Sequence, residues 1–239
     1  MRSPTAAKAV GRATYLMTPS PQMGFTGSPA ACSSGTTDPA YRTAELTRIN
    51  ALRAIARCSP TVTENANWSA DAQSAAMMVA ANNAITHTPP SSCACYSATN
   101  AATAGRSNLG RGIAGPEAVS GYVSDPGQVT NEVGHSAGLF WPSLTTVGVG
   151  DALSAGNRPY NVMKYLSAPN TTNPRAPVRD ASGYVSWPTC DTAFPYELLS
   201  EGSRGRSASR GSTGVRQRCR SPRTAWRSAR PGDRTVTPA

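Results

Sequence analysis

Ser136 lies in the segment Gly134-His135-Ser136-Ala137-Gly138, which matches G-x-S-x-G, the turn that presents the nucleophile of α/β-hydrolases. Such a serine needs a histidine base, and in that fold the base follows the serine in the chain. The two histidines of the chain are His87 and His135, and neither lies downstream of Ser136. Trp141-Pro142 would also interrupt the helix that should follow the serine. A serine hydrolase is therefore an alternative interpretation and not the preferred one.

The two histidines suggest a second chemistry, because neutral imidazole and carboxylate groups are ordinary zinc ligands. Asp125 and Glu132 lie close to His135 in the sequence. Their spacing does not form a recognised metal motif, and isolated histidines are more often structural than ligating. A zinc site at His87, His135 and Asp125 is thus a hypothesis, and a metal-bound water at the histidines is the second form of the hydrolase alternative.

Six cysteines are present, and disulfides explain them better than a metal site does. The pair Cys93-x-Cys95 has the wrong spacing for a zinc knuckle or a redox pair, so the cysteines indicate an oxidising compartment. Six cysteines allow fifteen pairings. We predict that Cys58, which follows the first expected helix, bridges to Cys93 or Cys95, with a contribution of about 3 to 4 kcal/mol. Cys219 is not expected to be a structural partner.

The formal charge of +10 is concentrated at one end of the chain. Residues 201–239 carry ten arginines against two acidic residues, whereas residues 40–200 carry equal numbers of basic and acidic side chains. The tail has one aromatic residue, Trp226, and no periodicity that would place its arginines on one face, so no nucleic-acid partner is expected. We predict that the tail is disordered, and its composition fits either a natural basic linker or a frameshifted end.

The elements that must position the candidate residues lie between the two ends. Residues 1–37 are rich in Ser, Thr, Pro and Gly, lack the apolar run of a secretory signal and are predicted to be disordered. A single domain is expected at 38–200, and no apolar stretch is long enough to predict a membrane span. Hydrophobic periodicity predicts helices at 40–57, 69–83 and 116–122, and β-rich runs predict strands at 145–149, 161–166 and 184–187.

Two N-caps support these helices. Asp38 followed by Pro39 is typical of a helix start, and Ser69 is predicted to cap the second helix.

Over residues 40–187 the order of motifs resembles the CAP superfamily of cysteine-rich secretory proteins, antigen 5 and pathogenesis-related proteins, in particular its bacterial secreted members. The motifs are Arg48-Ile49-Asn50-Ala51-Leu52-Arg53 within the helix Glu45 to Ala56, Ile85-Thr86-His87, Ser107-Asn108-Leu109, Gly121 to Gly127, Val133-Gly134-His135, Trp141-Pro142 and Val147-Gly148-Val149-Gly150. The resemblance implies an α+β fold, an α-β-α sandwich with a central antiparallel sheet between helical layers. The resemblance also accounts for Gly134-His135, because the family has a Gly-His pair at this place, so the G-x-S-x-G match does not require an esterase.

The resemblance further implies a cleft with two histidines and two acidic residues. These positions correspond to His87, His135, Asp125 and Ser107, so that a serine stands where the family has its first acid, and Glu132 is a nearby substitute. The incomplete set predicts no required cofactor and at most weak, pH-dependent zinc binding. Family members are mostly extracellular, non-enzymatic binding or signalling modules, and some are similar to sterol or lipid carriers.

We therefore expect a secreted or envelope-associated, non-enzymatic module that binds an unidentified small or macromolecular ligand, with a lipid or an envelope component as candidates. The sequence leaves the oligomeric state open.

Overall fold

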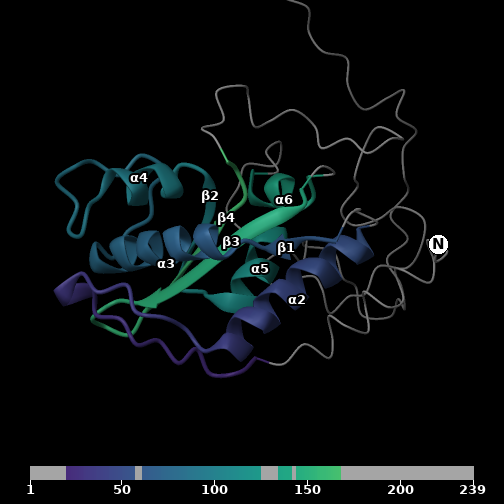
Figure 1. The fold of residues 1–239 in the computed structure, drawn as a ribbon, viewed down its shortest axis with the longest axis horizontal. Helices are drawn as coiled ribbons and strands as arrows, with labels where there is room; N and C mark the ends of the chain where they lie inside the picture. The colour runs from purple at the N-terminus through teal and green to yellow at the C-terminus, as the bar shows by residue number, and fades with distance from the viewer. Residues whose placement is uncertain (1–19, 57–60, 125–133, 142–143, 168–239) are drawn as a thin grey trace, which may run out of the picture.

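The computed structural model describes residues 20–56, 61–124, 134–141 and 144–167. These residues form one 3-10 helix, five α-helices and a four-stranded sheet, which confirms the expected α+β class (Figure 1). The elements in chain order are η1 (Pro29–Ala31), α2 (Pro39–Ile55), β1 (Thr63–Glu64), α3 (Ala66–Ala81), α4 (Ala98–Ala104), β2 (Ser107–Arg111), α5 (Gly115–Ser124), α6 (Gly134–Leu139), β3 (Thr146–Leu153) and β4 (Pro159–Lys164).

The helix starts follow local capping chemistry, with one correction. The Asp38 side chain accepts a hydrogen bond from the Ala40 amide and Pro39 is the first helical residue, as predicted. The second helix begins three residues earlier than the expected cap, because Asn65 accepts from the Trp68 amide. Ser69 lies inside that helix.

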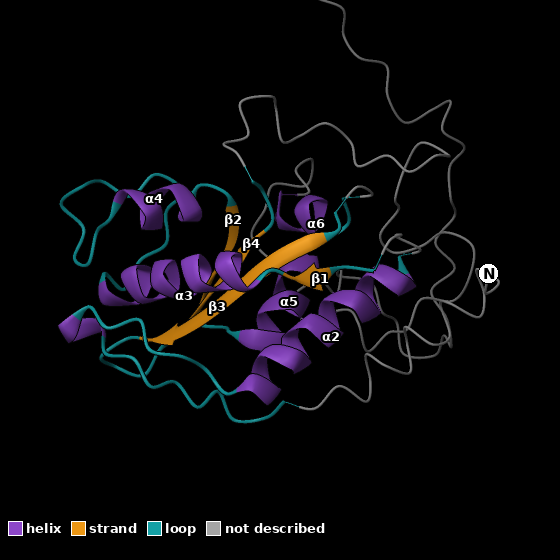
Figure 2. Ribbon diagram, in the orientation of Figure 1, coloured by secondary structure: helices purple, strands orange, loops and turns teal. Residues whose placement is uncertain are grey.

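The sheet has the order β1-β3-β4-β2 and is mixed, because the short β1 pairs with β3 in parallel while the other pairs are antiparallel. The sheet lies between two groups of helices (Figure 2). On one face, Val147 and Val149 of β3 and Met163 of β4 pack against α2, α5 and α6. On the other face, Ala152, Tyr160 and Val162 pack against α3 and α4. This arrangement agrees with the expected α-β-α layers.

Helix α3 approaches β3 closely because Gly148 and Gly150 have no side chains. A Cβ added at Gly150 would lie 2.2 Å from the Gln73 amide nitrogen, and one at Gly148 would lie 2.3 Å from the Trp68 carbonyl carbon. Strand β1 pairs with only two residues of β3. Farther along β3, side chains of α3 form hydrogen bonds with the backbone groups on the edge that faces away from β4. Ser69 Oγ accepts from the Val149 amide at 3.1 Å, and Gln73 both accepts from the Asp151 amide and donates to its carbonyl.

Disorder was expected for residues 1–37, and this does not hold for residues 20–37. Cys32 forms a disulfide with Cys95, 63 positions away, which fastens this segment to the loop before α4. Gln73 Nε2 also donates to the Ser34 carbonyl at 3.1 Å. A covalent link, a buried amide and the packing of Phe25 against the core thus hold the segment. Residues 1–19 lie outside the described residues.

The same disulfide corrects the predicted pairing of Cys58. Cys95 is bonded to Cys32, and Cys93 is a free thiol in the structure, so neither of the two expected partners carries the Cys58 bridge. Sequence spacing favoured a loop of about 35 residues, whereas the Cys32–Cys95 bridge joins residues 63 positions apart. Cys58 itself, the predicted strand at 184–187 and the tail at 201–239 lie outside the described residues.

Candidate functional site

His87 follows the end of α3 and is held by the carboxyl end of α4. Its ring Nδ1 lies 2.9 Å from the Ala104 carbonyl oxygen, and the side chain is exposed. The carbonyl groups in the last turn of a helix have no intrahelical partner, so a histidine N–H is a natural donor to them. With Nδ1 engaged in this way, Nε2 is the nitrogen that can meet a ligand.

Ser107, which the sequence resemblance places at the family's first acid, begins β2 and is buried. Its hydroxyl donates to the Thr103 carbonyl at 2.6 Å. The serine therefore satisfies the same helix end that holds His87 and supplies no negative charge. The next residue, Asn108, is also buried, and its Nδ2 donates to the His135 carbonyl at 3.0 Å.

His135 lies in α6 and its ring stacks on Tyr122 of α5, with centroids 5.3 Å apart. It is half-buried, in contrast to His87. Ser136, the candidate nucleophile, is 6% exposed and lies within α6 rather than on a strand-to-helix turn. This burial differs from the exposed nucleophile that the G-x-S-x-G geometry requires.

The structure thus connects both histidines to one segment, residues 104–108 at the junction of α4 and β2. His87 contacts its first residue, Ala104, and His135 contacts Asn108. Asp125 and Glu132, the two expected acids near His135, lie outside the described residues. Within the described ranges no group of three or more His, Cys, Asp or Glu side chains is arranged to hold a metal ion.

A second polar cluster, which the sequence did not reveal, lies between α2, α5 and the sheet. Asn161 of β4 donates to Glu45 at 2.8 Å and to Asp151 at 2.9 Å, and it accepts from the Tyr122 hydroxyl at 2.6 Å. Asp151 also accepts from the Gly115 amide at 2.8 Å. Gly115 has a φ of +53°, and a Cβ there would collide with a tyrosine ring, so only glycine fits this turn.

Glu45 and Asp151 form a carboxyl pair that requires a proton. Burial raises the pKa of Glu45 well above its ordinary value, and the charge of Asp151 raises it further. Burial also raises the pKa of Asp151, although hydrogen bonds from Asn161 and Gly115 oppose the shift. Glu45 Oε2 and Asp151 Oδ2 are buried and accept no other hydrogen bond from the described residues, so a proton that Glu45 carries and donates to Asp151 satisfies both atoms.

The described residues also enclose an open groove of 480 Å³ between residues 34–36, the start of α2, β1 and α3. Arg42 and Glu64 are its charged residues. Neither the groove nor the carboxyl pair could be recognised as a motif, because their members come from separate elements. The only signal was Glu45, a charged residue inside the apolar stripe of a helix.

A mixed sheet between two helical layers, a disulfide between segments 63 positions apart and two histidines at one helix–strand junction together define a small α+β domain. The profile of the cysteine-rich secretory protein family, CAP, matches residues 46–165, about half of the chain, and the chain belongs to this family. No curated protein sequence matches the chain significantly.

Proposed function

We propose that the protein is an extracellular, non-enzymatic CAP module of the bacterial secreted type. The Cys32–Cys95 disulfide supports an oxidising compartment, because such bonds persist outside the reducing cytosol. No helix within the described residues is long and apolar enough to cross a membrane. The module acts by binding a ligand, small or macromolecular, among which lipids and envelope components are candidates.

The observation that carries the proposal is the common attachment of His87 and His135 to residues 104–108. The His87 ring is held by the Ala104 carbonyl. The His135 ring stacks on Tyr122, and its backbone carbonyl accepts from Asn108, so both positions are set before a ligand arrives. Two neutral imidazoles can hold a divalent metal or hydrogen-bond a polar ligand. With Ser107 in place of an acid, such a metal site is weak.

The burial of Ser136 supports binding rather than catalysis. Ser136 is buried within α6, where an ester substrate has no direct access to the hydroxyl. The family relationship points the same way, since a CAP fold does not by itself imply an enzymatic activity.

Zinc titration followed by NMR of the histidine side chains tests the proposal. We expect zinc to shift or broaden the signals of both histidines together. His87→Gln should remove the response of His135, because the two share one ion, whereas Thr88→Ala should leave both responses unchanged. Independent responses in the His87→Gln variant would contradict a shared site.

An esterase assay separates binding from catalysis. The full chain should hydrolyse a simple aryl ester no faster than buffer does, with or without zinc. Hydrolysis that disappears in Ser136→Ala would establish the serine hydrolase instead. Zinc-dependent hydrolysis that disappears in His87→Gln would establish the metal-bound water.

A further inference from the structure

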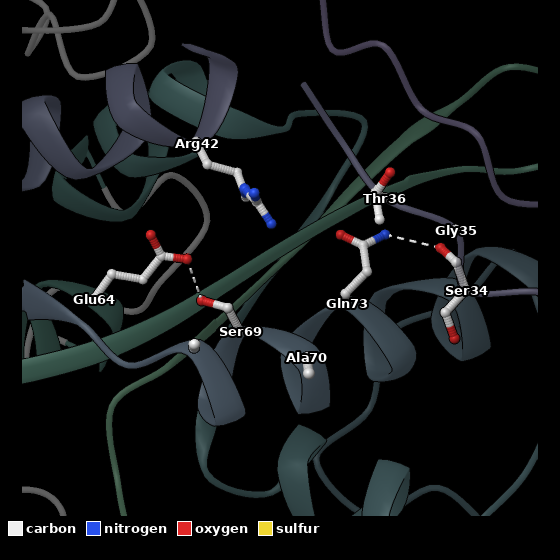
Figure 3. A pocket seen from close by; sticks show the side chains of 9 residues that line it. Ser34, Gly35, Thr36, Arg42, Glu64, Ser69, Ala70 and Gln73 are labelled. Atoms are coloured by element: carbon white, nitrogen blue, oxygen red, sulfur yellow. Dashed lines mark hydrogen bonds between the residues drawn. The ribbon is translucent and has the colours of Figure 1, made fainter. Parts of the chain in front are cut away.

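The 480 Å³ groove is separate from the histidine junction and is built from four segments (Figure 3). One wall is the backbone of residues 34–36 and the opposite wall is Glu64 at β1. Ala66 and Ala70, one helical turn apart on α3, contribute small apolar side chains to its floor. The volume falls in the range of small-molecule sites, which combine an apolar surface with a few polar groups.

The wall formed by residues 34–36 is held in place by a disulfide and hydrogen bonds. The Cys32–Cys95 disulfide holds the segment that contains residues 34–36, and the Gln73 amide fixes the Ser34 carbonyl. The Thr36 amide donates to the Thr26 hydroxyl at 2.9 Å. A ligand therefore meets a preformed surface, which reduces the entropy cost of binding.

Arg42 is the cation of the groove, and its guanidinium points into the open space (Figure 3). Among the described residues this guanidinium has no hydrogen-bond or ion-pair partner. It is the fourth residue of α2, near the positive end of the helix dipole, where a cation is mildly unfavourable. Helix stability thus does not explain why an arginine stands at position 42. Binding of an anionic group in the groove would explain it.

Glu64 supplies the opposite charge. Its Oε1 accepts from the Ser69 hydroxyl at 2.6 Å, which orients the carboxylate and leaves Oε2 for another donor. Arg42 and Glu64 both line the groove and are not paired with each other. An anion alone would be repelled by Glu64 and a cation alone by Arg42, whereas a ligand with both charges satisfies the two groups.

We propose that this groove binds a small zwitterion, a free α-amino acid or a short peptide with both termini free, whose carboxylate pairs with Arg42 and whose ammonium pairs with Glu64. Guanidinium groups bind carboxylates through two parallel hydrogen bonds, which suits a terminal carboxylate. The alanine floor accepts an aliphatic side chain. No aromatic side chain lines the groove among the described residues, so a ligand that binds by stacking is less suited to it.

Calorimetric titration of the full chain with matched probes tests this assignment. L-alanine and L-alanyl-L-alanine carry both charges, the N-acetylated dipeptide lacks the ammonium, and the dipeptide amide lacks the carboxylate. At least one zwitterion should bind, and loss of either charge should weaken binding by about ten- to hundredfold, as expected for one charge-assisted hydrogen bond. The stronger of alanine and dialanine identifies the ligand as an amino acid or a peptide.

Variants test which residue binds each charge of the ligand. For each variant, one probe should bind more weakly and another should bind as before. Arg42→Gln should weaken binding of the zwitterion by about tenfold or more but leave binding of the dipeptide amide unchanged. Glu64→Gln should weaken binding of the zwitterion but leave binding of the N-acetylated dipeptide unchanged. Arg158→Gln, at an exposed turn, is the charge control. Ala70→Trp should block the groove, whereas Ala102→Trp, exposed on α4, should not.

The proposal is overturned if no zwitterion binds at concentrations up to about 10 mM, or if the N-acetyl and amide probes bind as tightly as the dipeptide. Binding that is insensitive to Arg42→Gln and to Ala70→Trp would place the ligand elsewhere. None of these results depends on the histidines, so the groove and the histidine site are tested separately.

Discussion

Glu45→Gln should change the pH dependence of stability more than the stability itself. In the folded protein Glu45 is protonated and donates to Asp151, while in the unfolded chain it ionises above its ordinary pKa of 4.5. Folding above that pH therefore takes up a proton. The contribution of this pair is fully present below pH 4.5 and is lost as pH rises toward the raised pKa of the folded state.

The magnitude follows from the linkage between protons and stability. One proton bound only by the folded state lowers the free energy of unfolding by about 1.4 kcal/mol for each pH unit. The glutamine amide keeps the acceptor for Asn161 and supplies a permanent donor to Asp151, so the variant needs no proton. Two pH units within this range should therefore shift the difference between variant and wild type by about 2.7 kcal/mol in favour of the variant.

Urea unfolding followed by tryptophan fluorescence at several values between pH 4.5 and 7.5 measures this difference. All other ionisable groups are common to both proteins, so subtracting the two curves isolates Glu45. Glu117→Gln, an exposed carboxylate on α5, is the control for removal of an acid. If the difference between Glu45→Gln and wild type is independent of pH, the shared proton does not exist.

Three further outcomes follow from the packing. Gly150→Ala should lower the free energy of unfolding by about 1 to 3 kcal/mol in a thermal melt, because the new Cβ would lie 2.2 Å from the Gln73 amide nitrogen and must displace α3. Arg53→Lys should cost about 3 kcal/mol in urea unfolding, since Arg53 is 1% exposed and donates to the carbonyls of residues 139, 141 and 144, a fork that an ammonium cannot reproduce. Cys32→Ser should cost about 4 kcal/mol and expose residues 20–37 to hydrogen exchange, and a reductant should destabilise the wild type but not this variant.

The elements that depend on local signals could be predicted from the sequence. Asp38 and Pro39 determine the start of α2, and the β-rich runs locate β3 and β4 within a few residues. Strand β2 was not expected, because Ser107–Arg111 contains no β-branched residue and is a strand through its pairing with β4. Ser69 was mistaken for a cap because its hydroxyl bonds Glu64 and β3 rather than its own helix.

The candidate site could be predicted only where single residues carry a recognisable pattern. His87 and His135 were found as the two histidines of the chain, but their shared contact with residues 104–108 is a property of the fold. Asp151 follows an ordinary strand pattern and gives no sign that it faces Glu45 from 106 positions away. Long-range pairing of this kind also explains why the Cys32–Cys95 bridge was missed.

The contacts of Ser69 and Gln73 with β3 also bear on how copies of the protein meet. The unpaired backbone groups of an edge strand are a template to which a strand from another molecule can add. Such addition is the first step of domain swapping and amyloid growth. Along β3 the amides of residues 149 and 151 and the carbonyl of residue 151 are already bonded by these two side chains. The closeness of α3, which the glycines at 148 and 150 permit, leaves no space for an incoming strand. Helix α3 thereby protects this edge of the sheet from polymerisation, a role that charged residues or proline fill in other proteins.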